Sequence, residues 1–485
     1  MEKTSAARAI EWSIDLEKSL RSNKPGQDLE AINQMGPRLE QWCREPEVNM
    51  SESNMFGLIN GEEKLFANAI LLRLADAFTS ENKQIKASVV KLFLYLWKNC
   101  KKKGCNQLDR VMSKLSLMNR VELLRRVKVV FDGGDTESRA LALTFFGCCA
   151  CIAKERAEIR YLILSSLMSS DVLEVKASLF AAGCFSELSD DFASVFFEIL
   201  VNMVTSSDLS WDVRLVGVRL FSKMGSSLTL ASKAYKIGIK LLLDSLEEDL
   251  SRVLLISLSR LASRSICLIS GQVNLLFTFL SPDKPLLLKA TALRCLQYIA
   301  AREICDFSST ADSLEILVHI LEESSFSPLL RCGALNLLQK MMLSYALPTM
   351  SDTNMLMIPK LFIVLKNSVQ SSIWEERVSA IGILIDLAQN ITGKKDATFL
   401  ASRIMLFVID QINWLVRQVQ DLHQQDGHSL LGLLLYLVEN YPDLGSVELD
   451  RICLILEYLL DSCDQFEGNN GRFFASKWKS FTKSR

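Results

Sequence analysis

The side chain in this sequence best suited to general acid–base chemistry is histidine, and the chain contains only three. Histidine is also the commonest metal ligand, so each position needs an explanation. His319 lies in the apolar stretch 314–321. Apolar neighbours on both sides predict a helix with a packed His319 side chain, and we expect no catalytic role for it.

The other two histidines, His423 and His428, flank Asp426, and these three side chains could together bind a metal ion. However, the run Gln-Gln-Asp-Gly at 424–427 indicates a helix end and a turn, and no cysteine is near in sequence. We therefore expect no metal site here. A hydrolase that uses His423 or His428 is the weakest of the functions considered below.

Thirteen cysteines occur in the chain, mostly inside apolar patterns. Cys148, Cys149 and Cys151 lack the paired C-x-x-C spacing of zinc ligands. In a reducing compartment such cysteines act as small hydrophobic residues of the core. We expect them to pack, and the cysteine usage indicates an intracellular protein.

Glycine-rich phosphate-binding motifs and the nucleophile-elbow motif are absent from the sequence. The run Asp-Gly-Gly-Asp at 132–135 is a turn whose acidic flanks would repel phosphate. The acidic run 247–249 is most simply a solvated loop. The sequence therefore predicts no enzyme, and it assigns no catalytic, cofactor-binding or metal-binding residue.

The net charge is −1, from 55 basic and 56 acidic residues, so broad attraction to nucleic acid or to a membrane surface is not indicated. The longest apolar stretches, such as 430–438, are about half of a membrane span. No signal-peptide pattern is found in residues 1–20. The basic run 101–103 predicts a solvated loop, with a nuclear-import signal as the alternative.

The histidines, cysteines and acidic runs described above are expected to lie on a repeating helical element. A basic residue followed by apolar or small residues at +3 and +4 recurs along the chain, and the first five copies are 37 or 38 residues apart. The next two gaps are 42 and 46 residues, within the range of helical repeats. The basic residues of the seven copies are Arg139, Lys176, Arg214, Arg252, Lys289, Arg331 and Arg377.

Positions i, i+3, i+4 and i+7 share one face of a helix, so each copy predicts the second helix of an antiparallel pair. Acidic or Ser-rich turns precede most copies and supply helix N-caps. We predict that the stripe packs between repeats and that the basic residues either line an inner surface or pair with an acid one repeat away. The residues expected in the core are Ala142, Leu143, Phe146, Leu179, Phe180, Val218 and Phe221.

The predicted fold class is all-α, a HEAT/armadillo-like α-solenoid, which is a superhelix of roughly ten antiparallel helix pairs. Pro-Gly, Gly-Pro and Glu-Pro pairs break the N-terminal segment. We therefore expect an N-terminal cap of one or two short helices over 1–60, helical repeats over 61–464, and a loose segment at 465–485 that continues in a longer chain.

Three stretches carry a family resemblance in their order and spacing. They are Leu-Phe-Ala-Asn-Ala-Ile-Leu-Leu-Arg-Leu-Ala-Asp-Ala-Phe at 65–78, Asp-Thr-Glu-Ser-Arg-Ala-Leu-Ala-Leu-Thr-Phe-Phe-Gly at 135–147, and Glu-Val-Lys-Ala-Ser-Leu-Phe-Ala-Ala-Gly-Cys-Phe-Ser at 174–186. Asp-Phe-Ala follows at 191–193. The chain resembles the N-terminal portion of the Integrator complex subunit 7 family, in the style of its plant members.

This resemblance implies a non-catalytic scaffold subunit of the nuclear Integrator complex, which supports small nuclear RNA 3′-end processing and RNA polymerase II regulation. The implied partners are other Integrator subunits and polymerase-associated proteins, without a small-molecule substrate, a cofactor or membrane insertion. The implied location is the nucleus, and an additional cytoplasmic location of the protein is left open. The alternative is a cytoplasmic adaptin- or importin-like adaptor for cargo or vesicle trafficking.

Overall fold

All the elements of the computed structural model are helices. The structure describes residues 5–22, 24, 26–44, 62–102, 116–206, 209–302, 311–322, 326–344, 352–391, 397–417, 424–447, 450–451 and 453–454. Within these ranges the helices form ten consecutive pairs. None of the described helices is both long enough and apolar enough to cross a membrane. The all-α prediction is confirmed.

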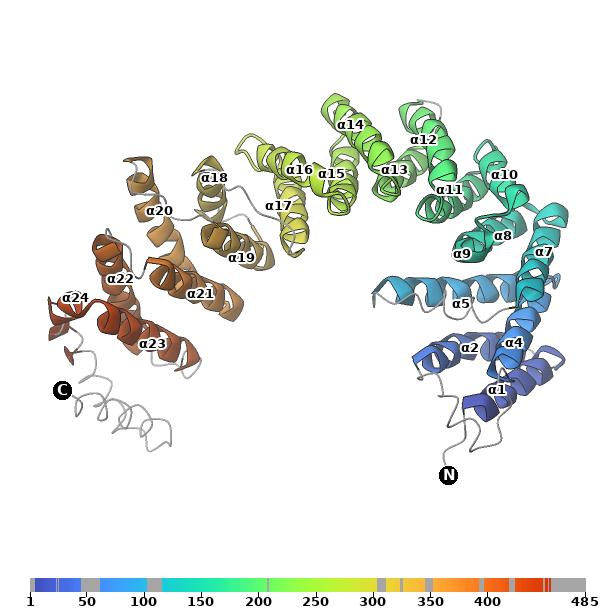
Figure 1. The fold of residues 1–485 in the computed structure, drawn as a ribbon, viewed down its shortest axis with the longest axis horizontal. Helices are drawn as coiled ribbons and strands as arrows, with labels where there is room; N and C mark the ends of the chain where they lie inside the picture. Colours follow the sequence, from blue (N-terminus) through green and yellow to red (C-terminus); the bar gives the residue numbers. More distant parts are fainter. Residues whose placement is uncertain are drawn as a thin grey trace. The chain divides into compact units, whose positions relative to one another are not determined.

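The chain folds as two compact units, and the first comprises Met1–Ser265. Within it, neighbouring helices alternate in direction and lie side by side (Figure 1). Its helices are α1 (Ser5–Leu20), α2 (Gln27–Arg44), α4 (Glu62–Phe78), α5 (Lys83–Lys102), α7 (Leu117–Gly133), α8 (Thr136–Cys148), α9 (Ala150–Ala153), α10 (Ala157–Ser166), α11 (Val172–Ser186), α12 (Asp190–Thr205), α13 (Trp211–Arg219), the 3₁₀ helix η1 (Leu220–Lys223), α14 (Leu228–Asp244) and α15 (Glu248–Ala262).

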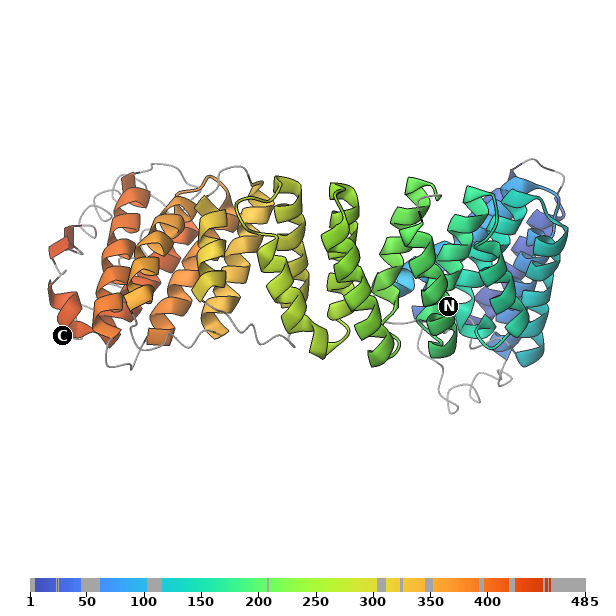
Figure 2. The same cartoon turned by 90° about the horizontal axis from the view of Figure 1, so that it is seen from above.

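The second unit comprises Ile266–Arg485 and holds four further pairs in its described part. Figure 2 shows that the helices within each unit run alongside one another. The helices of the second unit are α16 (Ile266–Thr278), α17 (Leu286–Ala300), α18 (Ala311–Glu322), α19 (Pro328–Ser344), α20 (Asp352–Val369), α21 (Trp374–Ile391), α22 (Ala397–Arg417), α23 (Gln424–Asn440) and the short α24 (Pro442–Val447).

The repeat inferred from the sequence coincides with the helix pairs. Each of the seven basic residues is the fourth or fifth residue of the second helix of a pair, in α8, α11, α13, α15, α17, α19 and α21. Two of these helices begin at aspartates that act as N-caps. Asp135 accepts a hydrogen bond from the Ser138 N–H at 3.0 Å, and Asp171 accepts from the Leu173 and Glu174 N–H groups. The predicted acidic caps are therefore present at α8 and α11.

Aromatic side chains connect successive pairs in the first unit. The ring of Phe145 on α8 lies 5.3 Å from that of Phe78 on α4 and 4.2 Å from that of Phe93 on α5. All three phenylalanines are fully buried. A repeat cannot bury its apolar stripe by itself, so these contacts show how stacking supplies the core.

Six of the seven predicted core residues are buried: Ala142, Leu143, Phe146, Leu179, Val218 and Phe221. The prediction for Phe180 is wrong, because that side chain is only half-buried. Its ring packs edge-on against Trp97 of α5 at 5.1 Å, toward the border of the stripe. The face of the helices predicted to be buried is thus correct, and Phe180 lies at the edge of that buried face.

Small residues allow close approach of neighbouring helices, both between repeats and within one pair. An added Cβ at Gly183 of α11 would lie 2.7 Å from Leu220 Cδ2, and one at Gly217 of α13 would lie 3.0 Å from Val204 Cγ2. Real side-chain carbons seldom approach so closely, since interiors are already densely packed. The glycines at these contacts therefore set the spacing between neighbouring helices.

The N-terminal segment is more regular than expected. The helices α1 and α2 have 16 and 18 residues, and they pack on α4 and α5 in the manner of a repeat. Pro37 does not break the segment, because it lies inside α2. The basic run at 101–103 is not wholly a loop either, since α5 extends to Lys102. The expected boundary near residue 60 and the segment 465–485 lie outside the described residues.

Candidate interaction surface

Ion pairs link the second helix of one pair to the second helix of the next. Arg139 Nη2 of α8 donates to Glu174 Oε2 of α11 at 2.9 Å, and Lys176 Nζ of α11 lies 3.1 Å from Asp212 Oδ2 of α13. In the second unit, Arg331 Nε of α19 lies 3.3 Å from Glu376 Oε1 of α21. For these three copies, pairing with an acid one repeat away is the arrangement observed.

Other copies of the basic residue are engaged locally. Arg214 Nε donates to the Val204 carbonyl at 3.2 Å, and its guanidinium lies over the Trp211 ring. Arg252 pairs with Asp249 of its own helix at 3.1 Å. The seven basic residues therefore do not form one continuous inner ladder.

The Arg139–Glu174 pair is the more buried of the two links in the first unit. The Glu174 side chain is 6% exposed, whereas that of Asp212 is 72% exposed. A buried carboxylate needs hydrogen-bond partners to offset its desolvation. Arg139 and the hydroxyl of Ser169 supply them, the latter at 3.0 Å.

The same kind of link joins α5 to α8. Lys83 Nζ lies 2.6 Å from Asp135 Oδ2 and 2.9 Å from Glu137 Oε2. The hydrogen bond to Asp135, followed by that to Glu137, raises the pKa of Lys83. The hydrogen bond from Lys83, followed by those from Ser138, lowers the pKa of Asp135.

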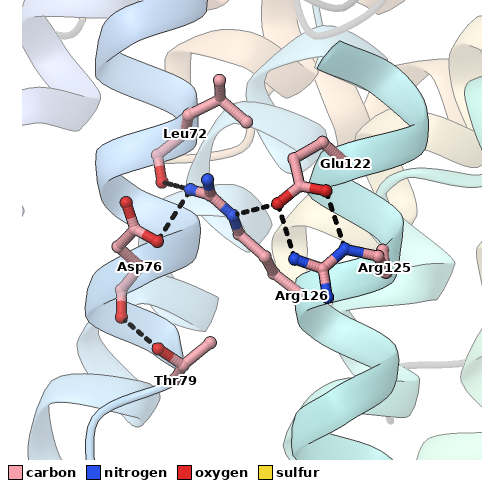
Figure 3. A network of polar contacts seen from close by, with 6 residues as sticks. All are labelled: Leu72, Asp76, Thr79, Glu122, Arg125 and Arg126. Atoms are coloured by element: carbon pink, nitrogen blue, oxygen red, sulfur yellow. Dashed lines mark hydrogen bonds and ion pairs between the residues drawn. The ribbon is translucent and has the colours of Figure 1, made fainter. Parts of the chain in front are cut away.

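First helices are linked by a separate polar network (Figure 3). Arg126 Nη1 of α7 reaches Asp76 Oδ1 of α4 at 2.7 Å and the Leu72 carbonyl at 2.8 Å. Arg126 Nε donates to Glu122 Oε1 at 2.9 Å, and Arg125 binds both oxygens of Glu122. Hydrogen bonds from Arg125 and then Arg126 lower the pKa of Glu122 to about 2. Arg126 thus joins two repeats through one guanidinium.

Of the three histidines in the sequence, only His319 has a described side chain. His319 is exposed on α18, so the prediction of a packed side chain is wrong. Its neighbours Val318 and Ile320 are buried, which places His319 on the opposite face of an amphipathic helix. His423 lies outside the described residues, and nothing is described of the side chain of His428. Residues 424–427 begin α23, where a turn was expected.

The expectation that the cysteines pack in the core holds for only some of those described, since Cys151 is half-buried and Cys267 and Cys453 are exposed. Cys148 and Cys149 are buried, and burial raises the pKa of both thiols well above the ordinary value. A raised pKa keeps the thiol protonated and therefore poorly reactive. Among the described residues, no group of three or more His, Cys, Asp or Glu side chains could hold a metal ion.

Apolar side chains are exposed at the starts of three second helices in the second unit. Leu286 and Leu287 begin α17, Leu329 is the second residue of α19, and Trp374 begins α21. Leu329 is 83% exposed. Each of these residues precedes the basic residue of its repeat by two or three positions. The pattern of buried apolar residues does not reveal them, because they lie outside the buried stripe. These exposed apolar residues recur near the start of three successive second helices and are candidates for contact with a protein partner.

A helical repeat array of this kind, with ion pairs between repeats and apolar side chains left exposed, defines a HEAT/armadillo-like α-solenoid. Repeat proteins of this class bind partners over extended surfaces. The family model "Integrator complex subunit 7, N-terminal" matches residues 64–478. The chain belongs to this family.

Several curated relatives carry the same family name. The chain is similar to Integrator complex subunit 7 of Gallus gallus, at 28% identity over 59% of this chain and 26% of the relative. The Homo sapiens protein is 27% identical over 59% of this chain, and that of Drosophila melanogaster is 24% identical over 60%. The chain matches only 26% of the length of each of these three relatives.

Among solved structures, the chain is similar to Kap121p, with a TM-score of 0.47 and 11% sequence identity. That alignment covers 98% of this chain and 53% of Kap121p. The likeness is too slight to bear on function.

Proposed function

We propose that this protein is a non-catalytic scaffold subunit of the nuclear Integrator complex. In this role it holds other Integrator subunits and RNA polymerase II-associated proteins along its helical surface. It thereby supports small nuclear RNA 3′-end processing and regulation of transcription. The observation that carries the proposal is the family match across residues 64–478.

The structure supports a role that depends on surface rather than on a reaction centre. Interfaces are dominated by a few aromatic or Arg side chains, and the chain exposes such residues. Tyr161 on α10 and Trp374 on α21 are 71% and 49% exposed. Ion pairs between repeats, such as Arg139–Glu174, hold neighbouring helices in fixed register and so fix the spacing of exposed side chains.

Affinity purification of the tagged protein from nuclear extract, followed by mass spectrometry, tests this proposal. We expect other Integrator subunits to copurify, and we expect the same subunits with a variant in which His423 and His428 are both replaced by Ala. Recovery of cargo or coat proteins without Integrator subunits would contradict the proposal and favour a cytoplasmic adaptor.

A further inference from the structure

A basic cluster lies on the second helices of the last two pairs of the first unit. It consists of Arg219 and Lys223, at the end of α13 and of η1, and Arg260 and Arg264, at and just after the end of α15. The helix α15 packs against both α13 and η1. Arg219 precedes Lys223 by four positions, and Arg260 precedes Arg264 by four positions.

Glu187 brings together two of these basic residues, Lys223 and Arg264. Its Oε1 atom accepts from Lys223 Nζ at 2.6 Å and from Arg264 Nη1 at 3.3 Å. Lys223 and Arg264 therefore converge on one oxygen. Arg219 and Arg260 each precede one of these two residues by four positions, which is about 6–8 Å along a helix.

The charge of this cluster is only partly neutralised. Glu187 offsets one of its four positive charges, and Arg219 and Arg260 are both exposed without a side-chain partner among the described residues. Glu248 is at the other end of α15, twelve residues before Arg260, which is about 18 Å along a helix. The cluster thus carries uncompensated positive charge in a chain whose net charge is −1.

Other carboxylates on these second helices are already paired. Asp212 lies beside Lys176, and Asp249 lies beside Arg252. Because these acids have partners of their own, they do not neutralise the cluster. A ligand for the cluster must therefore bring its own negative charge.

Apolar side chains adjoin the cluster with the same spacing in both helices. Ile256 precedes Arg260 by four residues and is 38% exposed, and Leu215 precedes Arg219 by four residues and is half-buried. Each of the two segments therefore carries an apolar residue, an arginine and a second basic residue at intervals of four positions. A surface of this kind fits a segment with both carboxylates and apolar side chains.

We propose that the basic cluster binds an acidic, partly apolar segment of a protein partner. Carboxylates of the segment pair with Arg219 and Arg260, and an apolar side chain of the segment rests on Ile256 and Leu215. This inference rests on the proposed scaffold function and names the surface and the partner chemistry.

Protein is favoured over RNA because single-stranded nucleic acid is bound largely by stacking of bases on aromatic rings. Two aromatic residues occur in α13, η1 and α15. Trp211 is half-buried next to the Arg214 guanidinium, and Phe221 is fully buried. Neither offers an open ring at the cluster.

Fluorescence anisotropy with a labelled peptide of about 16 residues, made of repeated Glu-Glu-Leu-Asp, tests the proposal on the full chain at about 50 mM salt. We expect binding that weakens by about tenfold or more in the double variant Arg219→Glu/Arg260→Glu. The matched control is Lys233→Glu/Lys236→Glu on α14, which makes the same charge change at exposed positions. The control should change the affinity by less than about twofold.

The variant Arg219→Gln/Arg260→Gln removes the same positive charges without adding acids. It should also weaken peptide binding, and it replaces the charge-reversal variant if that variant does not fold. Equal weakening in the cluster and control variants would overturn the proposal, because binding would then follow net charge alone. Tighter binding of a polyuridine RNA of equal length, lost in Arg219→Glu/Arg260→Glu, would overturn it in favour of a nucleic-acid site.

This measurement is independent of the proposed function. It uses a synthetic peptide and the purified chain, so a failure to bind leaves membership of Integrator to be decided by copurification. Conversely, a chain that binds the peptide through Arg219 and Arg260 but does not copurify with Integrator subunits contradicts only the proposed function.

Discussion

Arg139 and Glu174 lie 35 residues apart in the chain, yet both guanidinium nitrogens Nε and Nη2 of Arg139 donate to one oxygen of Glu174. The pair joins the second helix of one repeat to that of the next. Glu174 is buried, so this contact offsets part of the cost of removing its carboxylate from water. The repeat period of the sequence thus has a direct physical counterpart in a cross-repeat ion pair.

Removal of Arg139 should therefore destabilise the first unit. We expect Arg139→Ala to lower the free energy of unfolding by about 1–3 kcal/mol, because it leaves a buried carboxylate with fewer partners. Lys176→Ala is the matched control, since its partner Asp212 is largely exposed, and it should cost less than about 1 kcal/mol. Urea unfolding of both variants measures the difference, and equal losses would contradict the burial argument.

The polar network around Glu122 predicts acid sensitivity. Its folded pKa of about 2 is below the ordinary value of 4.5, so the ionised form is favoured by folding. The resulting stabilisation is complete above pH 4.5 and is lost as the pH falls from about 4.5 toward 2. Thermal melts between pH 6 and pH 3 should show the decline, and Glu122→Gln should show a smaller one. An unchanged pH profile in Glu122→Gln would contradict this role.

The aromatic contact of Phe145 with two phenylalanines of the preceding repeat predicts a large effect of one truncation. Phe145→Ala should cost about 3–5 kcal/mol, because a buried ring that touches Phe78 and Phe93 is replaced by a cavity. Tyr161→Ala, on the exposed face of α10, should change the stability by less than about 0.5 kcal/mol. Thermal unfolding followed by circular dichroism separates the two. Similar melting temperatures for the two variants would exclude Phe145 from the core.

Two helical glycines predict opposite effects of the same substitution. A Cβ at Gly147 would lie 2.8 Å from Phe180 Cε1 and 3.0 Å from the Ala181 backbone, so Gly147→Ala should destabilise by about 1–3 kcal/mol. No atom lies within 4 Å of a Cβ at Gly432 in α23. Gly432→Ala should therefore stabilise by up to about 1 kcal/mol through helix propensity. Shifts of the same sign in thermal unfolding would contradict the packing at Gly147.

Periodicity made the helices and most of the core predictable. Arg139 and its six counterparts fall at the fourth or fifth position of the second helices, because the same apolar stripe recurs near the start of each of these helices. The exceptions lie at the border of a face. Phe180 and His319 lie in apolar stretches of the sequence, which is why the sequence predicts both to be buried. Their actual exposure depends on which residues pack against them in the folded chain.

The basic cluster could not be predicted from the sequence. Glu187 and Arg264 are 77 residues apart and span two repeats, so no short pattern connects them. Their contact depends on how α11, η1 and α15 stack, which the repeat spacing alone does not specify. The family resemblance likewise does not indicate which surface binds which partner.

The proposed function is tested most directly by the 3′ ends of small nuclear RNAs after depletion of this protein. Sequencing of those ends should reveal extended transcripts, and re-expression of the wild-type chain should restore normal ends. Normal 3′ ends after complete depletion would contradict the proposal that this protein supports small nuclear RNA processing as an Integrator scaffold.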